Sequence, residues 1–330
     1  MIKASITATA RFLPEKVVTN YDLEKMMDTS HDWIVTRTGI EERRICSEDE
    51  TTSVMCTHVA NELLEKSGLN ADEVDAIIVG TVTPDMLFPS TAAIIQNEIG
   101  AKHAWGFDLS AACSGFLFAL DTGARLLESG KYKNVIILGA DKMSSIINYN
   151  DRETSVLFGD GAGGVLVSPN QNDEGFIDSI LFIDGGGGDL LKMPGGGSLN
   201  PATVETIEKN MHYVQQDGKK VFKSAVKGMS DVVKKLLLKN QLSSEDIKLF
   251  IPHQANKRII DACRENLNLS EDQVFINIQK YANTTAGTIP ICISEAADSN
   301  LLQAGDYLVL ASFGAGFTWG SILLKWGNAT

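Results

Sequence analysis

The amino-acid sequence predicts an α/β fold made of two similar halves. Short apolar runs that are typical of buried strands alternate with longer segments whose apolar residues recur at helical spacing. A polar loop at residues 169–173 interrupts this alternation, and the same order of strands and helices then begins again. We therefore expect an N-terminal half at residues 1–172 and a C-terminal half at residues 173–330.

The first half starts with alternating apolar and polar residues, which predict a β-strand within residues 1–10. A basic stretch followed by an apolar one is missing there, so we do not expect a secretion signal. A helix is expected over residues 116–127, because apolar residues recur every three or four positions and Gly130 can end the helix. Apolar runs predict further strands at residues 74–80, 104–108, 134–139 and 163–168.

The second half repeats this plan. Helical periodicity predicts helices at residues 222–238, 256–267 and 286–300, and apolar runs predict strands at residues 248–252 and 306–312. Two pairs of strands fall at comparable places in the two halves, namely residues 76–80 with 249–252 and residues 135–139 with 308–311.

Composition and charge exclude several classes of protein. The chain has 330 residues, of which 44% are hydrophobic and 22% charged, as in ordinary globular proteins. Its apolar runs are shorter than the ~18 residues that a membrane-spanning helix needs. The net charge of −13 disfavours a nucleic-acid partner. Five irregularly spaced cysteines without a paired CxxC indicate a reducing cytoplasm and neither a disulfide framework nor a metal site.

Three residues that lie far apart in the sequence are the candidate catalytic groups. Cys113 should follow a buried strand and begin a helix, where the helix dipole favours the thiolate. His253 should end a strand, and Asn283 should lie in a turn before a helix. A cysteine with a distant His and Asn is the inventory of a thiol nucleophile with hydrogen-bonding partners. Buried structural roles for Cys113 and His253 remain open from the residues alone.

Three glycine clusters resemble nucleotide-binding motifs, but the residues around them do not fit such a site. Residues 159–164 satisfy G-x-G-x-x-G, but a strand follows them where a dinucleotide site needs a helix. The clusters at residues 185–188 and 195–197 lack the Lys-Ser/Thr of a phosphate loop. We therefore expect none of these clusters to bind a nucleotide.

The sequence around the candidate catalytic residues resembles the initiating β-ketoacyl-acyl-carrier-protein synthases, known as synthase III. The matching segments are DLSAACSGF around Cys113, PHQAN around His253 and NTTAGTIP from Asn283. Further matches are TSHDWIVTRTGI from Thr29 and SFGAGFTWG from Ser312, and the resemblance extends over about residues 3–326. It implies the thiolase fold, in which two αβ halves form a five-layered αβαβα sandwich, and a homodimer.

Asn283 distinguishes this family from its relatives. Relatives that condense by deprotonation pair the His with a second Cys, and the elongating synthases pair it with a second His. The Cys–His–Asn set resembles the initiating synthases and the plant-type polyketide synthases, which are usually longer than this chain. Papain-like proteases also use Cys, His and Asn, but their motif around the cysteine is absent here.

The resemblance implies a two-step condensation that initiates fatty-acid synthesis and needs no cofactor beyond its thioester substrate. Cys113 would take a short acyl group, with acetyl as the expected one, from coenzyme A, with an oxyanion hole formed by the backbone N–H groups of Cys113 and Gly316. His253 and Asn283 would then stabilise the enolate that malonyl-carrier protein forms as it loses carbon dioxide.

The resemblance also implies binding residues. Trp33 and Arg37 match residues that receive the coenzyme A nucleotide, and Arg152 matches the arginine that stacks on adenine opposite Trp33. Phe88 matches a residue that reaches into the partner subunit's acyl pocket. Coenzyme A is also expected at Thr29, Gly218, Phe222, Ala255 and Asn256, and the acidic carrier protein at Lys223, Gln254, Lys257 and Arg258.

Other functions stay open beside this one. A starter synthase of a specialised lipid or polyketide pathway would use a longer or aromatic primer. An acyltransferase or thioesterase would use the same acyl-cysteine without losing carbon dioxide from malonate. A non-catalytic acyl-binding protein is disfavoured because the sequence retains Cys113, His253 and Asn283 together.

Overall fold

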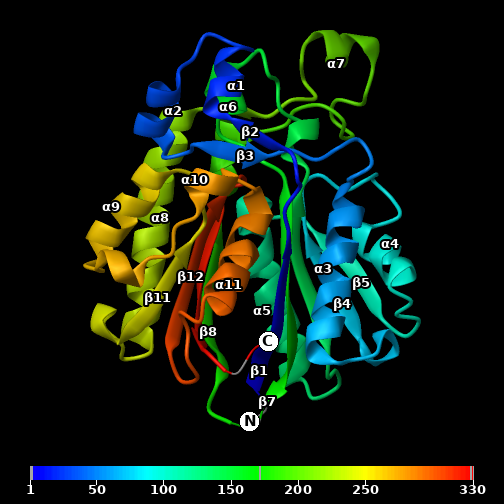
Figure 1. The fold of residues 1–330 in the computed structure, drawn as a ribbon, viewed down its shortest axis with the longest axis vertical. Coiled ribbons are helices and arrows are strands. Elements are labelled where there is room, and N and C mark those ends of the chain that lie inside the picture. Colours follow the sequence, from blue (N-terminus) through cyan, green and yellow to red (C-terminus); the bar gives the residue numbers. More distant parts are fainter. Residues whose placement is uncertain (1–2, 171, 328, 330) are drawn as a thin grey trace.

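Two β-sheets form the frame of the protein (Figure 1). The computed structural model describes residues 3–170, 172–327 and 329. Met1 and Ile2 of the predicted first strand and Gln171 of the predicted boundary loop lie outside the described residues. The first sheet contains, in spatial order, β1 (Lys3–Phe12), β7 (Gly161–Asn170), β6 (Val135–Asp141), β4 (Ala76–Gly80) and β5 (Trp105–Leu109). The second contains β11 (Ile247–Pro252), β12 (Tyr307–Gly314), β13 (Thr318–Lys325) and β8 (Gly175–Ile183).

Helices cover both outer faces and fill the space between the sheets. Figure 1 shows one helix pair outside the first sheet, a second pair outside the second sheet and a third pair in the middle. This arrangement is the αβαβα sandwich that the sequence predicts. The three pairs are α3 (Thr52–Ser67) with α4 (Thr91–Glu98), α8 (Gly218–Lys239) with α9 (Lys257–Leu267), and α5 (Gly115–Glu128) with α11 (Thr288–Asp298).

Shorter elements gather at one end of the sandwich, at the top of Figure 1. They lie near the mouth of the cavity described below. Among the helices of the described residues, none is long and apolar enough to cross a membrane. These elements are β2 (Val17–Thr19), α1 (Asn20–Glu24), α2 (His31–Thr38), β3 (Glu42–Arg44), α6 (Arg152–Ser155), β9 (Leu191–Lys192), α7 (Val204–Glu208), β10 (Gln215–Gln216) and α10 (Ile278–Tyr281).

Strands β4 and β6 are apolar throughout because both of their faces are buried. Successive side chains of a strand point to opposite faces. Ile78 and Ile137 therefore enter the core between the sheets, whereas Ile77 and Ile136 pack with α3 and α4 on the outer face. All four side chains are fully buried, which explains why the continuous apolar runs at residues 74–80 and 134–139 predicted these strands well.

The two sheets share one connectivity. β4 pairs with β6 in parallel, as β11 pairs with β12, and each pair is followed by an antiparallel strand, β7 or β13. β1 and β8 then complete the two series. The predicted division after residue 172 falls between β7 and β8 and stays a prediction, and β7 extends through Pro169 and Asn170, which we expected to lie in a loop.

The glycine-rich segment of β7 lets α11 approach the first sheet closely. A Cβ atom at Gly163 would lie 2.7 Å from the backbone nitrogen of Ile291, and one at Gly139 would lie 2.3 Å from the carbonyl oxygen of Ala286. Both positions therefore require glycine, because these partners are backbone atoms that cannot rotate away. Gly163, at a variable position of the G-x-G-x-x-G segment, thus serves helix–sheet packing, and the segment continues into strand β7 as expected.

We expect the substitution Gly163→Ala to lower the free energy of unfolding by about 2 kcal/mol, because the new methyl group overpacks the contact with α11. The matched control is Gly185→Ala, where a Cβ would meet no atom within 4 Å. Urea unfolding followed by circular dichroism measures both. Equal stability of the two variants would contradict this role for Gly163.

Candidate active site

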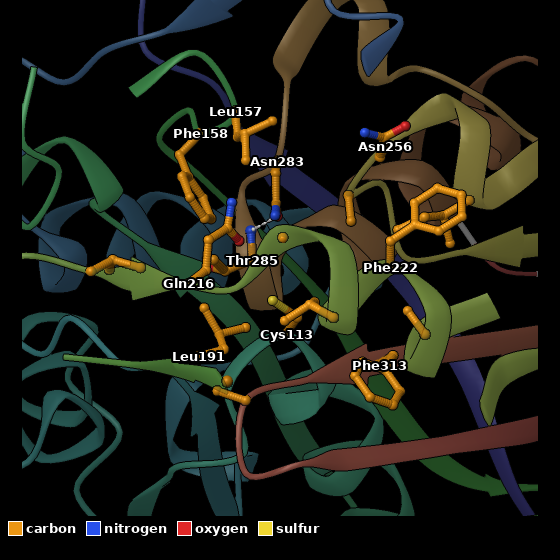
Figure 2. A pocket seen from close by; sticks show the side chains of 18 of the residues that line it. Cys113, Leu157, Phe158, Leu191, Gln216, Phe222, Asn256, Asn283, Thr285 and Phe313 are labelled. Atoms are coloured by element: carbon orange, nitrogen blue, oxygen red, sulfur yellow. Dashed lines mark hydrogen bonds between the residues drawn. The ribbon is translucent and has the colours of Figure 1, made fainter. Parts of the chain in front are cut away.

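A cavity of about 860 Å³ opens among the short elements and reaches down to the two central helices. Cys113, His253 and Asn283 all line it, although they come from three distant parts of the chain. Figure 2 shows Cys113 and Asn283 facing the same space, with Leu157, Phe158 and Leu191 beside it. The fold therefore brings together the three residues that the sequence singled out.

Cys113 lies in a tight turn between β5 and α5. The preceding Ala112 has a φ of 48°, a left-handed conformation that is unfavourable for a residue with a side chain. Burial raises the pKa of the Cys113 thiol to about 12, and the charge of Asp141 adds to this rise. Cys113 lies at the start of a helix as predicted, but burial opposes the thiolate that we expected and favours the thiol.

The β12–β13 hairpin holds this turn in place. Ser312 Oγ donates to the carbonyl oxygen of Cys113 at 2.8 Å, and Thr318 Oγ1 donates to that of Ala111 at 2.8 Å. Between the two strands, the hairpin contributes Ala315 to the cavity lining, one position before the predicted Gly316.

His253 directly follows β11 and is buried, with 2% of its surface exposed. Its Nδ1 lies 2.7 Å from Thr288 Oγ1. Its Nε2 is also buried and has no hydrogen-bond partner among the described residues. Burial lowers the pKa of His253 to about 3, so the ring is neutral at physiological pH.

Asn283 is oriented by its own backbone turn. The backbone N–H of Thr285 donates to Asn283 Oδ1 at 2.8 Å, drawn as a dashed line in Figure 2. The backbone of Asn283 is held between Leu157 and Gly159 by bonds of 3.0 and 3.1 Å. Because Oδ1 already accepts, the Asn283 amide offers its Nδ2 protons to the cavity.

Asp141, at the end of β6, holds the Asn283 turn in place through hydrogen bonds. Its buried carboxylate accepts six hydrogen bonds, two of them from the Thr285 hydroxyl and the Ala286 backbone N–H. The other four come from Thr81, Val82 and Thr83. Burial raises the pKa of Asp141, and these donors oppose that rise. The carboxylate therefore ties the first sheet to the Asn283 turn.

Comparison with known proteins identifies the family. Residues 107–189 match the family of 3-oxoacyl-acyl-carrier-protein synthase III, and residues 237–326 match its C-terminal part. A β-ketoacyl-acyl-carrier-protein synthase III of Chlorobaculum tepidum is 55% identical over 98% of this chain and 100% of its own. The chain belongs to the synthase III family. It is therefore a condensing acyltransferase of fatty-acid synthesis, and the predicted family and reaction are confirmed.

Solved structures agree with this assignment and confirm the predicted thiolase fold. The synthase III of Aquifex aeolicus VF5 is 42% identical, with a TM-score of 0.91, and the match covers 99% of this chain and 100% of that one. The priming β-ketosynthase from the R1128 polyketide pathway is 31% identical, with a TM-score of 0.92 over 99% of this chain and 97% of that one.

The mouth of the synthase cavity carries the predicted coenzyme A residues. Trp33 and Arg37 line it, and the guanidinium of Arg37 lies 4.7 Å from the centre of the Trp33 ring. Arg152 also stacks on Trp33, at 4.8 Å, and donates to the carbonyl oxygen of Asp28. The predicted adenine site between Trp33 and Arg152 is therefore closed here, and a base can enter only if Arg152 moves.

The cavity wall below the mouth matches the predicted tunnel. Asn256 is fixed by a hydrogen bond of 3.0 Å from its Nδ2 to the carbonyl oxygen of Arg37. Thr29 precedes α2 and is not one of the described residues that line the cavity. The predicted tunnel residues that do line it are Gly218, Phe222, Ala255 and Asn256.

The predicted carrier-protein contacts fall into two groups. Lys223, Lys257 and Arg258 are exposed beside the cavity mouth, and Arg258 stacks on Phe222 at 5.6 Å. Lys257 is paired with Asp261 at 2.7 Å. The prediction for Gln254 needs correction, because its side chain is 1% exposed and bonded to Pro252, Phe275 and Asn277, out of reach of a partner.

Phe88 does not line the cavity of its own chain. Its ring is 83% exposed, and the neighbouring Leu87 is 82% exposed. An exposed ring of this kind is compatible with the predicted reach into a second subunit.

The residues that support the candidate catalytic groups were not predicted from the sequence. Asp141, Thr285 and Thr288 hold Asn283 and His253, and neither spacing nor composition indicated these supporting roles. One signal was available for Asp141, since a charged residue ending a buried strand is unusual.

In the described part of the chain, no cluster of three or more His, Cys, Asp or Glu side chains could hold a metal ion.

We expect Asp141→Asn to lower the free energy of unfolding by about 3 kcal/mol, because an amide cannot accept all of the hydrogen bonds that converge there. Condensing activity should also fall, because Thr285 loses the contact that holds the Asn283 turn. Urea unfolding and product formation measure the two effects.

The matched control is Asp108→Asn, which alters a carboxylate that accepts from the first backbone N–H groups of α4 at 2.7 and 2.9 Å. It should cost about 1 kcal/mol and leave activity unchanged. Wild-type stability and activity in Asp141→Asn would refute the anchoring role.

Proposed function

We propose that Cys113, His253 and Asn283 condense a short acyl-coenzyme A, acetyl-coenzyme A first, with malonyl-carrier protein. The product would be a 3-ketoacyl-carrier protein, with release of carbon dioxide and coenzyme A. The observation that carries this proposal is that His253, whose buried Nε2 has no hydrogen-bond partner among the described residues, lines the same cavity as the Asn283 amide and the Cys113 thiol. Two donors beside a thiol suit a thioester whose oxygen becomes negative.

In the first half-reaction, Cys113 Sγ bonds to the acyl carbon and the bond to the coenzyme A sulfur breaks. The thiol proton of Cys113 is transferred to the departing sulfur of coenzyme A, which leaves as the thiol. The negative oxygen of the tetrahedral intermediate accepts from backbone N–H groups. We assign these to Cys113 and to the turn after Phe313, where Ala315 lines the cavity and Gly316 was predicted.

In the second half-reaction, the thioester oxygen of malonyl-carrier protein accepts hydrogen bonds from His253 Nε2 and Asn283 Nδ2. The bond to the carboxylate then breaks, carbon dioxide leaves, and its electron pair forms the enolate. The enolate carbon attacks the acyl carbon on Cys113, and the released thiolate takes up a proton from solvent. A neutral, buried His253 suits this role, because a hydrogen bond from a buried donor to the enolate is stronger than one made in bulk water.

Coenzyme A would enter with its nucleotide at Trp33, Arg37 and Arg152 and its pantetheine along Gly218, Phe222, Ala255 and Asn256. Binding would require Arg152 to swing from Trp33 so that the adenine can stack between them. Thr29 remains a proposed contact at the mouth.

We further propose a homodimer in the cytoplasm. β5 is the edge strand of the first sheet, and its Trp105 is 41% exposed. A second copy could cover this edge and receive the exposed Phe88 near its acyl pocket. The five cysteines are free and buried, which fits a reducing compartment.

The decisive experiment is the intact mass of malonyl-carrier protein after incubation with the enzyme and acetyl-coenzyme A. We expect replacement of malonyl by acetoacetyl with the wild type and no product with Cys113→Ala. Asn283→Ala should accept the acetyl group but decarboxylate malonyl-carrier protein about a hundredfold more slowly, the cost of one lost oxyanion donor. Normal decarboxylation by Asn283→Ala would make this role assignment wrong.

The likeness to the R1128 priming synthase favours a second candidate, a starter synthase of a specialised pathway. Competition between acetyl-coenzyme A and longer, branched or aromatic acyl-coenzyme A thioesters distinguishes the two. An acetyl adduct on Cys113 without condensation would point instead to an acyltransferase.

The proposed carrier-protein surface is defined by Lys223, Lys257 and Arg258. We expect Lys223→Glu combined with Arg258→Glu to raise the KM for malonyl-carrier protein about tenfold, because each change replaces attraction to an acidic partner with repulsion. The rate with malonyl-coenzyme A, which needs no carrier surface, should be unchanged. Lys133→Glu, between α5 and β6, is the control for net charge, and an equal rise of KM in that variant would refute the surface.

A further inference from the structure

We propose that Thr288 is a positioning residue that fixes the tautomer of His253, holding the proton on Nε2 so that the ring can donate to the substrate. This inference rests on the proposed function, in which His253 donates to the thioester oxygen. It concerns a residue that never touches substrate and acts only through His253.

The contact is short and enclosed. Thr288 Oγ1 lies 2.7 Å from His253 Nδ1, and the two residues are 3% and 2% exposed. Thr288 is the first residue of α11, the helix that presses against the glycines of the first sheet. This packing fixes the position of the hydroxyl relative to the ring.

The Thr288 hydroxyl has one proton and two neighbouring acceptors. One is His253 Nδ1, and the other is the carbonyl oxygen of Thr285 at 3.2 Å. If the hydroxyl donates to Thr285, Nδ1 must carry the ring proton and Nε2 can only accept. If it donates to Nδ1, the proton of a neutral ring resides on Nε2.

Geometry favours the second arrangement. The contact with His253 Nδ1 is the shorter of the two, and the Thr285 carbonyl oxygen already accepts from the backbone N–H of Thr288, so it does not need the hydroxyl proton. Nε2 then points into the cavity as a donor beside Asn283 Nδ2, and the enolate oxygen receives two protons. With the opposite tautomer, the Nε2 lone pair would repel that oxygen.

A direct test observes the tautomer. Long-range proton–nitrogen correlation spectra of the full-length enzyme labelled with nitrogen-15 histidine distinguish protonated from unprotonated ring nitrogens. His253 is identified by its absence in His253→Gln, since the chain contains five histidines. We expect a protonated Nε2 and an unprotonated Nδ1 in the wild type. A protonated Nδ1 would overturn the proposal.

A kinetic test uses Thr288→Val, which keeps the shape and removes the hydroxyl, with Thr288→Ser as the conservative variant. Carbon dioxide release from malonyl-carrier protein should fall about tenfold in the valine variant, the value of one buried hydrogen bond, and recover in the serine variant. Acylation by acetyl-coenzyme A, which does not need a donating His253, should change less than about twofold.

The control is Thr122→Val, which removes a hydroxyl that donates to a helix carbonyl in α5 at 2.7 Å. Equal decarboxylation by the wild type and Thr288→Val, or equal loss of acylation and decarboxylation, would overturn the proposal. If the wild type releases no carbon dioxide at all, the proposed function fails, and the spectra still decide whether Thr288 sets the tautomer.

Discussion

The close approach of α11 to the first sheet is the constraint on which the active site depends. Gly139 and Gly163 remove the side chains that would otherwise separate helix from sheet. Because of this contact, Asn283 and Thr288 from the second half of the chain reach the cavity of Cys113 from the first half. The geometry of the site is therefore set by backbone packing between the two sheets.

Two buried ionisable groups lie beside this contact, and the free-energy cost of burying a charge is avoided differently in each. His253 is neutral, because burial lowers its pKa to about 3 and Thr288 is the single hydrogen-bond partner of its ring within the described part of the chain. Asp141 is surrounded by donors that can stabilise its charge. His253 therefore keeps an Nε2 that has no hydrogen-bond partner among the described residues. The hydrogen-bonding capacity of the Asp141 carboxylate is used by the neighbours that it holds in place.

The fold and the candidate catalytic residues could be predicted from the sequence because both leave local signals. β4 and β6 are continuous apolar runs, and Cys113, His253 and Asn283 stand in distinctive motifs. The roles of Asp141 and Thr288 could not be predicted in this way, since their partners lie 144 and 35 residues away in the sequence and only the fold joins them. Gln254 was misplaced at the surface because a motif does not reveal which of its side chains the fold buries.

The contacts between the β12–β13 hairpin and the Cys113 turn have a consequence for the synthesis of the chain. The hydroxyl of Ser312 that fixes this turn lies 199 residues further along the chain, and Gly314 packs against the backbone nitrogen of Cys113. During translation, the cysteine leaves the ribosome long before the hairpin that shapes its surroundings. A partly synthesised chain therefore carries the Cys113 thiol in a turn that Ser312 and Gly314 do not yet hold in place.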